Sequence, residues 1–320
     1  ELFGRWIRLH VLFRKRKRRL SMFLQQNTLE GLREYFSKSV SNQFSESEIK
    51  LMFKAFVTKR MELTDTEFML NRGLSGAEVR FSESDLLYFR SVVKRLQANE
   101  PFQYIHGKTE FYGLELLCDK RALIPRPETE ELVDWILENL NPKKEFNVVD
   151  ICSGSGCIAL ALKSVLENAH VEAWELSVEA LELIEENKAL TGLNIVSVKM
   201  DALSNSYPAS AESADIIVSN PPYIPNAERS RMHANVLDFE PDLALFVEDS
   251  DPFIFYDKIA MESSKLLVDG GWLYFEIHED FETEMIDLFE NHGFVNIELR
   301  KDLQGRSRMM RGQRVPSQHE

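Results

Sequence analysis

The sequence lacks any long apolar run, contains few cysteines and is short of positive charge. No stretch approaches the ~18 consecutive apolar residues that a membrane-spanning helix needs, so a membrane protein is not expected. The three cysteines, Cys118, Cys152 and Cys157, have neither the even count of a disulfide framework nor the paired spacing of a zinc site. This cysteine usage predicts a protein of the reducing cytoplasm.

The charge balance disfavours nucleic acid as a partner. The chain has 38 Lys and Arg against 52 Asp and Glu, which gives a net charge of −14. Most non-specific affinity for nucleic acid comes from cations that neutralise backbone phosphates. The acidic excess therefore favours a protein or a small molecule as the substrate.

Residues 1–21 are the exception, with eight Lys/Arg against one Glu and a block of six from Arg14 to Arg19. Such a block is typical of a nucleic-acid or targeting patch, and an arginine-rich, acid-poor leader is typical of an organelle transit peptide. We favour a basic leader outside the fold, upstream of a true start at Met22, because an amphipathic helix pattern begins shortly after it. A bacterial cytoplasmic protein is then expected, or an organellar one if the leader is a transit peptide.

The remaining length exceeds one ordinary core and favours two domains. From Thr28 to about Asn99, apolar residues recur at three-to-four spacing, which is typical of short amphipathic helices. Ser82 and Asp85 have the spacing of a capping pair for the last of these helices. We expect an N-terminal helical domain, for substrate recognition, over residues 22–100.

The residue pattern changes at Pro101 and again after Glu128. Aromatic and β-branched residues, broken by Gly107 and Gly113, predict a β-hairpin linker over residues 101–127. Alternating strands and helices over residues 128–320 then predict an α/β domain with a parallel sheet. The expected strands cover 148–151, 171–176, 195–200, 216–219, 272–277 and 295–300, and the expected helices 156–166, 178–190 and 281–291.

A turn of small residues, Cys152-Ser153-Gly154-Ser155-Gly156, follows the strand expected at 148–151. Its glycines let the backbone approach a ligand, and the next helix offers unpaired N–H groups. Close packing of strand and helix needs the same residues, so the turn alone leaves both roles open. Glu175 ends the next strand, where it is either a solvated strand end or an acceptor for ribose hydroxyls. Because the spacing differs from the dinucleotide fingerprint, a methyl donor is a better candidate than a nicotinamide.

The most specific feature is Asn220-Pro221-Pro222-Tyr223, directly after the strand expected at 216–219. Ligands of open α/β sheets bind at the carboxyl ends of strands, and two prolines stiffen the loop. The Asn220 side-chain oxygen and the Pro221 carbonyl can each accept one N–H of a target NH₂ group, while Tyr223 can pack on that planar group. An amide or aromatic amino nitrogen is a weak nucleophile, so its methylation depends on such positioning.

These stretches resemble the PrmC/HemK family of release factor glutamine methyltransferases, from about Leu29 to Arg311. The linker residues Ile124-Pro125-Arg126-Pro127-Glu128-Thr129-Glu130 carry the resemblance together with the glycine turn and Val218 to Pro225. The family implies a small helical bundle, a β-hairpin joint and a seven-stranded Rossmann-like methyltransferase domain whose last strand is antiparallel. It also implies S-adenosylmethionine as methyl donor, S-adenosylhomocysteine as product, and the Gly-Gly-Gln loop of a peptide chain release factor as substrate, in support of translation termination.

The resemblance also implies roles for particular residues. Cofactor binding would fall to Cys152, Ser153, Gly154, Ser155, Gly156, Glu175 and Asn220. The glutamine would be held by Asn220, Pro221, Pro222 and Tyr223, of which Asn220, Pro221 and Tyr223 would be catalytic. Where relatives can have an aromatic residue after the acidic residue at 201, this chain has Ala202, which puts cofactor contact there in doubt.

Other residues have simpler interpretations. His278-Glu279-Asp280 is expected to form a polar turn and cap, and His106 and His233 have no partners at metal spacing, so no metal is expected. Ser153 and Ser155 have no evident base. The alternatives are a glutamine methyltransferase of a ribosomal protein, an adenine-amino nucleic-acid methyltransferase, which the Asn-Pro-Pro-Tyr loop permits, and a binding protein without catalysis. We expect a monomer with no membrane association.

Overall fold

The computed structural model describes residues 27–71, 80–138, 140–208 and 213–315. These residues form two compact units, which divide between His106 and Gly107. The basic leader at 1–21 lies outside the described residues. Within the described ranges no helix has the length and apolar content needed to cross a bilayer.

The first unit is helical. Its helices are α2 (Leu29–Val40), α3 (Glu46–Met61), α4 (Asp65–Asn71), α5 (Glu83–Gln97) and α6 (Phe102–His106). Ser82 and Asp85 form a capping box at the start of α5, which confirms the predicted pair. Phenylalanines fill the core, where the Phe36 ring lies 5.6 Å from that of Phe53 and 6.2 Å from that of Phe56.

The stretch expected to hold only a hairpin begins with helix α6. Tyr104 and Ile105 of this helix are buried, so tertiary packing outweighs the local preference of these residues for a strand. The two predicted strands follow as β1 (Lys108–Phe111) and β2 (Leu114–Leu117), paired antiparallel. Tyr112 and Gly113 both have positive φ, at 50° and 73°, as a two-residue hairpin turn requires.

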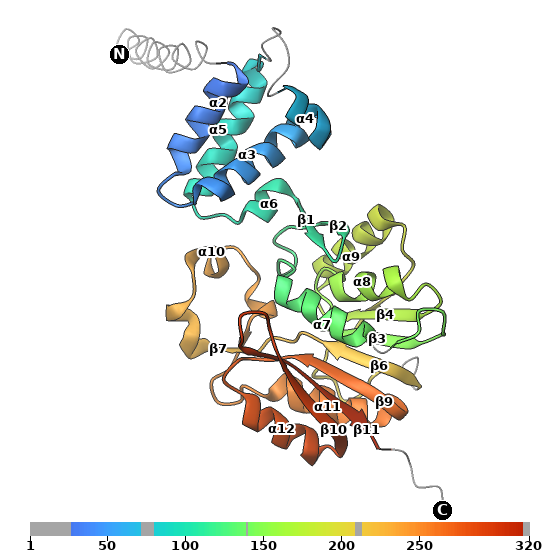
Figure 1. Cartoon of the computed structure of the whole chain (residues 1–320). Helices are drawn as coiled ribbons and strands as arrows, with labels where there is room; N and C mark the ends of the chain where they lie inside the picture. Colours follow the sequence, from blue (N-terminus) through green and yellow to red (C-terminus); the bar gives the residue numbers. More distant parts are fainter. Residues whose placement is uncertain (1–26, 72–79, 139, 209–212, 316–320) are drawn as a thin grey trace, which may run out of the picture. The chain divides into compact units, whose positions relative to one another are not determined.

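The second unit contains one seven-stranded sheet in the order β10-β11-β9-β6-β3-β4-β5 (Figure 1). Only β11 runs antiparallel to its neighbours, which confirms the expected α/β fold with an antiparallel last strand. The strands are β3 (Asn147–Ile151), β4 (His170–Glu175), β5 (Val196–Lys199), β6 (Ala214–Ser219), β9 (Leu267–Glu276), β10 (Phe294–Lys301) and β11 (Ser307–Arg314).

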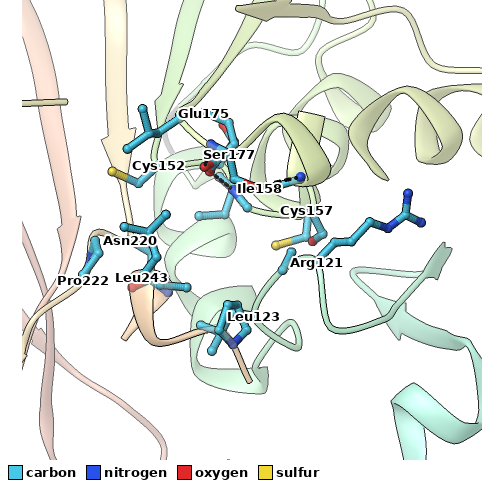
Figure 2. A pocket seen from close by; sticks show the side chains of 18 of the residues that line it. Arg121, Leu123, Cys152, Cys157, Ile158, Glu175, Ser177, Asn220, Pro222 and Leu243 are labelled. Carbon is cyan, nitrogen blue, oxygen red and sulfur yellow. Dashed lines mark hydrogen bonds between the residues drawn. The ribbon is translucent and has the colours of Figure 1, made fainter. Parts of the chain in front are cut away.

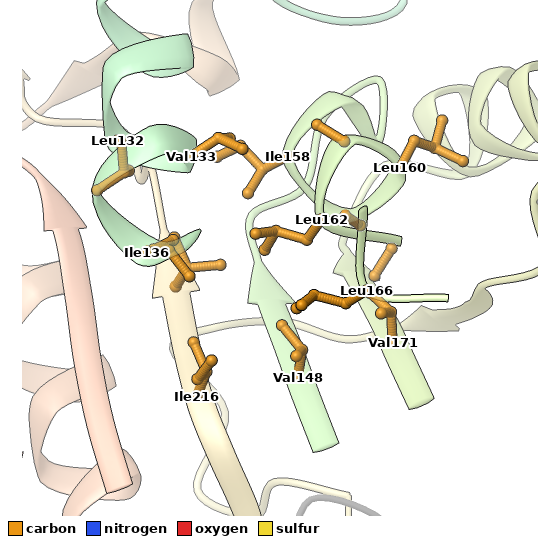
Figure 3. Close-up of a cluster of buried hydrophobic side chains, with 14 of the residues drawn as sticks. Leu132, Val133, Ile136, Val148, Ile158, Leu160, Leu162, Leu166, Val171 and Ile216 are labelled. Atoms are coloured by element: carbon orange, nitrogen blue, oxygen red, sulfur yellow. The ribbon is translucent and has the colours of Figure 1, made fainter. Parts of the chain in front are cut away.

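Helices cover both faces of this sheet. α7 (Pro127–Leu137), α8 (Cys157–Val165) and α9 (Val178–Thr191) pack on one face, and α11 (Ile254–Leu266) and α12 (Glu282–Asn291) on the other. Figure 3 shows the first cluster, where Leu132, Ile136 and Leu162 lie over Val148 and Ile216. Neighbouring strand residues alternate between the two cores, because successive side chains of a strand point to opposite faces. Helices α7 and α11 and strand β11 were not among the elements predicted from the pattern.

A long connection joins β6 to α11. It contains the short strands β7 (Ile224–Pro225) and β8 (Phe246–Val247), which pair parallel, and between them η2 (Asn226–Arg231), α10 (Ala234–Leu237) and η3 (Asp242–Ala244). Glu240 of this connection has a buried carboxylate that accepts hydrogen bonds from the Ile124 backbone N–H at 3.1 Å and from Arg126 Nη2 at 2.5 Å. The carboxylate thus fastens the connection to the exit of the linker.

Candidate functional site

A pocket opens at the carboxyl ends of the central strands, with about 1000 Å³ of empty space when the solvent at its mouth is counted. It lies where the strand order reverses around β3 and β6, the usual ligand position in such sheets. Figure 2 shows Glu175 and Cys152 on one side of the pocket and Leu123 and Leu243 on another. The lining comes from the linker exit, the glycine turn, the ends of β4, β5 and β6, and the segment between β7 and β8. It includes Arg121, Thr129, Ser153, Ser155, Met200, Asp201, Ala202, Pro222, Ala244 and Phe255.

The glycine turn has three residues in the left-handed region of φ. Cys152 is at 61°, Gly154 at 55° and Gly156 at 78°. Gly154 lines the pocket, whereas Gly156 is not among the lining residues, and a Cβ added to it would lie 3.2 Å from Ile184 Cγ1 of α9. The two roles that the sequence left open are therefore divided, with Gly154 facing the pocket and Gly156 serving close packing.

Glu175 holds the glycine turn against the end of β4. One carboxylate oxygen accepts from the Gly154 N–H at 2.8 Å, and the other accepts from the Ser177 N–H at 2.8 Å. Burial raises the pKa of this carboxyl, and the backbone N–H groups oppose that shift. The Leu176 N–H also bonds this carboxylate, which has about four lone-pair sites and so can still accept from a ligand hydroxyl. Glu175 is therefore partly buried and hydrogen-bonded to the backbone, and it is not the solvated strand end that we considered as the alternative.

The Asn-Pro-Pro-Tyr loop divides between the pocket and the core. Asn220 and Pro222 line the pocket, whereas Pro221 and Tyr223 are not among the lining residues. The Tyr223 hydroxyl donates to Glu276 Oε1 at 3.1 Å, and its ring meets His278 edge-on at 6.0 Å. Burial raises the pKa of the Tyr223 hydroxyl above its ordinary range. Tyr223 is thus partly buried against the core of the sheet, and its contact with the substrate stays a prediction.

Two lining contributions have no local signal in the sequence. The exit of the linker supplies Arg121 to Arg126 as one wall, held in part by Glu240. Ala202, whose contact with a cofactor was in doubt, also lines the pocket, and its carbonyl accepts from the Tyr207 hydroxyl at 2.7 Å. The resemblance of residues 124–130 to the family's linker is the signal in the sequence that points to the first of these walls.

The remaining polar candidates are structural. His278 accepts from the Asp280 N–H within the predicted polar turn, but the α12 N-cap is Phe281, without a side-chain cap bond, so the predicted cap is wrong. Ser153 Oγ donates to the Asp150 carbonyl at 2.7 Å. Burial raises the pKa of Cys118 and of Cys157 to about 12, so neither is a thiolate at neutral pH. Across the described residues no group of three or more His, Cys, Asp or Glu could hold a metal ion.

Comparison with known proteins adds the biochemical context. Residues 131–237 match the family model of the methyltransferase small domain. Proteins named release factor glutamine methyltransferase are similar over nearly the whole chain. The relative from Flavobacterium psychrophilum is 37% identical over 88% of this chain and 98% of its own, and that from Bacteroides thetaiotaomicron is 36% identical over the same shares. The relative from Streptococcus pneumoniae is 38% identical over 86% of this chain and 94% of its own.

Proposed function

The chain belongs to the family of release factor glutamine methyltransferases, and on this basis we propose that its pocket transfers a methyl group from S-adenosylmethionine to the glutamine side-chain amide in the Gly-Gly-Gln loop of a release factor. The observation that carries the proposal is that Asn220 lines the same pocket as Gly154 and Glu175. A group that can orient an amide thus lies beside a turn suited to a nucleoside.

The donor half of the pocket fits an adenosine-containing ligand. Gly154 has no Cβ to fill the space, and the Glu175 carboxylate can still accept a hydrogen bond from a ribose hydroxyl. We assign cofactor binding to the turn residues Cys152, Ser153, Gly154 and Ser155 together with Glu175, while Gly156 supports the turn by packing. When bound, S-adenosylmethionine supplies a methyl group on a positively charged sulfur.

The acceptor half must orient a poor nucleophile. The lone pair of an amide nitrogen is delocalised, so the nitrogen reacts only when it is held in line with the methyl group. We assign the two N–H acceptors to the Asn220 side-chain oxygen and the Pro221 carbonyl, with Pro222 in the wall beside them. The nitrogen lone pair would form the bond to the methyl carbon, the bond from that carbon to sulfur would break and leave S-adenosylhomocysteine, and the nitrogen would lose one proton to water. Tyr223 contributes by holding the loop from below, because its hydroxyl is bonded to Glu276.

Recognition of a particular protein needs more than this pocket, which would accept any planar NH₂ group. We assign that task to the N-terminal helical domain, residues 22–100, and expect the protein to act as a monomer in the cytoplasm. The net charge of −14 supports a protein substrate over nucleic acid.

The test uses labelled S-adenosylmethionine with a folded release factor, a ribosomal extract and adenine-containing DNA and RNA. We expect label on the glutamine of the Gly-Gly-Gln loop, located by mass spectrometry, and none on adenine. A release factor with glutamate in place of that glutamine should stay unlabelled, since a carboxylate has no N–H to donate and no nucleophilic nitrogen. Label on adenine, or on a ribosomal protein alone, would overturn the proposal.

A further inference from the structure

A buried chain of hydrogen bonds runs from the end of β9 to the Asn220 carboxamide. Glu276, the last residue of β9, is 3% exposed, and Thr129, in the first turn of α7, is 2% exposed. Thr129 Oγ1 donates to Glu276 Oε2 at 2.6 Å and lies 3.4 Å from Asn220 Nδ2. These three residues are far apart in the sequence, and only the fold brings them together.

The number of hydrogens that these groups carry determines which group donates in each hydrogen bond. A hydroxyl has one hydrogen, and at 2.6 Å from a carboxylate, which can only accept, Thr129 gives its hydrogen to Glu276. Thr129 can then offer Asn220 only a lone pair, which must be met by the NH₂ end of the carboxamide. A reversed carboxamide would set the Asn220 oxygen against an oxygen with no hydrogen between them.

We propose that Thr129 and Glu276 are positioning residues which make Asn220 present its side-chain oxygen, and not its NH₂ group, to the substrate amide. Among the described residues no donor bonds to Asn220 Oδ1, so this oxygen is available on the pocket wall. The inference rests on the proposed function, in which that oxygen accepts an N–H of glutamine. With the carboxamide reversed, the Asn220 NH₂ group would face the pocket and donate to the carbonyl oxygen of the substrate amide. The substrate nitrogen would then be misplaced.

Glu276 also supports the other end of the Asn-Pro-Pro-Tyr loop. Its second oxygen accepts from the Tyr223 hydroxyl, so one carboxylate braces both Asn220, through Thr129, and Tyr223 directly. The Glu276 backbone carbonyl is held separately, by the Tyr256 hydroxyl at 3.0 Å. Both side-chain bonds require a carboxylate that accepts. Burial raises the pKa of Glu276, and the hydrogen bonds from Thr129 and Tyr223 together with the Arg308 guanidinium oppose that shift and favour the ionised form.

The experiment compares Thr129→Val, which keeps the shape and loses the hydroxyl, with Thr129→Ser, which keeps the hydroxyl. We expect Thr129→Val to lower kcat on a release factor on the order of 10- to 100-fold, as misorientation of a reacting group does. Binding of S-adenosylmethionine, measured by calorimetry, and KM for the release factor should stay within about fivefold, because one hydrogen bond to a neutral group accounts for only ~1 kcal/mol. Thr129→Ser should restore most of kcat. Tyr256→Phe, which deletes a buried hydroxyl bonded to the backbone at Glu276 and His278 and to neither Thr129 nor Asn220, is the matched control and should keep kcat.

A double-mutant cycle separates positioning from a general structural role. If Thr129 acts through Asn220, adding Thr129→Val to Asn220→Ala should lower kcat no further than about twofold, since there is no carboxamide left to orient. The same loss in both backgrounds, or a Thr129→Val enzyme as active as the wild type, would overturn the proposal. Failure of the wild-type enzyme to label a release factor would instead refute the proposed function, so the two failures are distinguishable.

Discussion

Replacing Gly154 and Gly156 by alanine, one at a time, should separate a residue that faces the pocket from one that packs beneath it. Both glycines are in the left-handed region, at φ 55° and 78°, within a single turn. Alanine there costs ~1–2 kcal/mol, and a less flexible unfolded chain offsets ~0.4–1 kcal/mol of that. This backbone contribution is common to both variants and cancels when their stabilities are compared.

The packing contribution differs between the two positions. At Gly156 a new Cβ lies 3.2 Å from Ile184 Cγ1 and 3.4 Å from Cγ2, and Ile184 is fully buried in α9. A β-branched helical residue has essentially one side-chain rotamer, so Ile184 cannot turn aside, and overpacking of this kind costs ~1–3 kcal/mol. At Gly154 the nearest atom is Ala122 Cβ at 3.9 Å, an ordinary contact. Gly156→Ala should therefore be less stable than Gly154→Ala by ~1–3 kcal/mol.

Affinity for S-adenosylmethionine should follow the opposite order. The Gly154 methyl group would occupy the pocket wall next to the N–H that bonds Glu175, and affinity should fall on the order of tenfold or more. Folded Gly156→Ala should bind nearly as the wild type does. Urea denaturation measures the first comparison and calorimetry the second. Equal losses of stability, or normal affinity in Gly154→Ala, would refute the division of roles between the two glycines.

Three further predictions concern two other residues of the pocket and Asp150 in strand β3. Asn220→Ala should lower turnover on the order of 100-fold or more and leave cofactor binding largely intact, and near-normal turnover would remove the loop from the mechanism. Glu175→Ala should weaken S-adenosylmethionine binding by ~1.5–3 kcal/mol, the range for hydrogen bonds to a charged group, and calorimetry on the folded variant checks this. Burial raises the pKa of Asp150 from 3.8 to about 7, so the folded state holds a proton that the unfolded state has lost between these values. The free energy of unfolding of the wild type, measured relative to Asp150→Asn by urea denaturation, should thus fall by roughly 1.4 kcal/mol per pH unit from pH 5 to 7 and then level off. A difference that stays constant over this range would contradict the raised pKa.

The parts of the fold that could be predicted are those in which local pattern and burial agree. β3 and β6 are apolar runs followed by residues that cannot continue a strand, so the glycine turn and the Asn-Pro-Pro-Tyr loop were placed correctly at strand ends. β11 gave no such signal, because its sequence contains three arginines. The Arg311 guanidinium lies over the rings of Trp135 and Trp272, at 4.9 and 4.4 Å, so a charged residue serves as packing material.

The site itself was predictable only where it is contiguous in the chain. The turn and the loop are read directly from the sequence, but the bond between Thr129 and Glu276 joins residues 147 positions apart. Tyr223 was expected to contact the substrate because it follows Asn220 by three residues in the same loop. The alternation of side chains between the two faces of a strand does not continue through Pro221 and Pro222. The sequence therefore could not show that the Tyr223 ring packs against the core.

Cys152 and Ala202 are the two departures from the family pattern, and the structure offers a compensation for each. Cys152 adopts φ 61°, where a residue other than glycine is strained by ~1–2 kcal/mol, but its side chain packs against the core beneath the pocket, which offsets part of that cost. Beside Ala202, Tyr207 donates to its carbonyl and sets its ring edge-on against Trp174 at 5.5 Å, so an aromatic residue supports this wall from behind. Among the described residues that line the pocket, the aromatic ring is that of Phe255. Contact of an aromatic ring with the adenine would therefore come from Phe255 of α11.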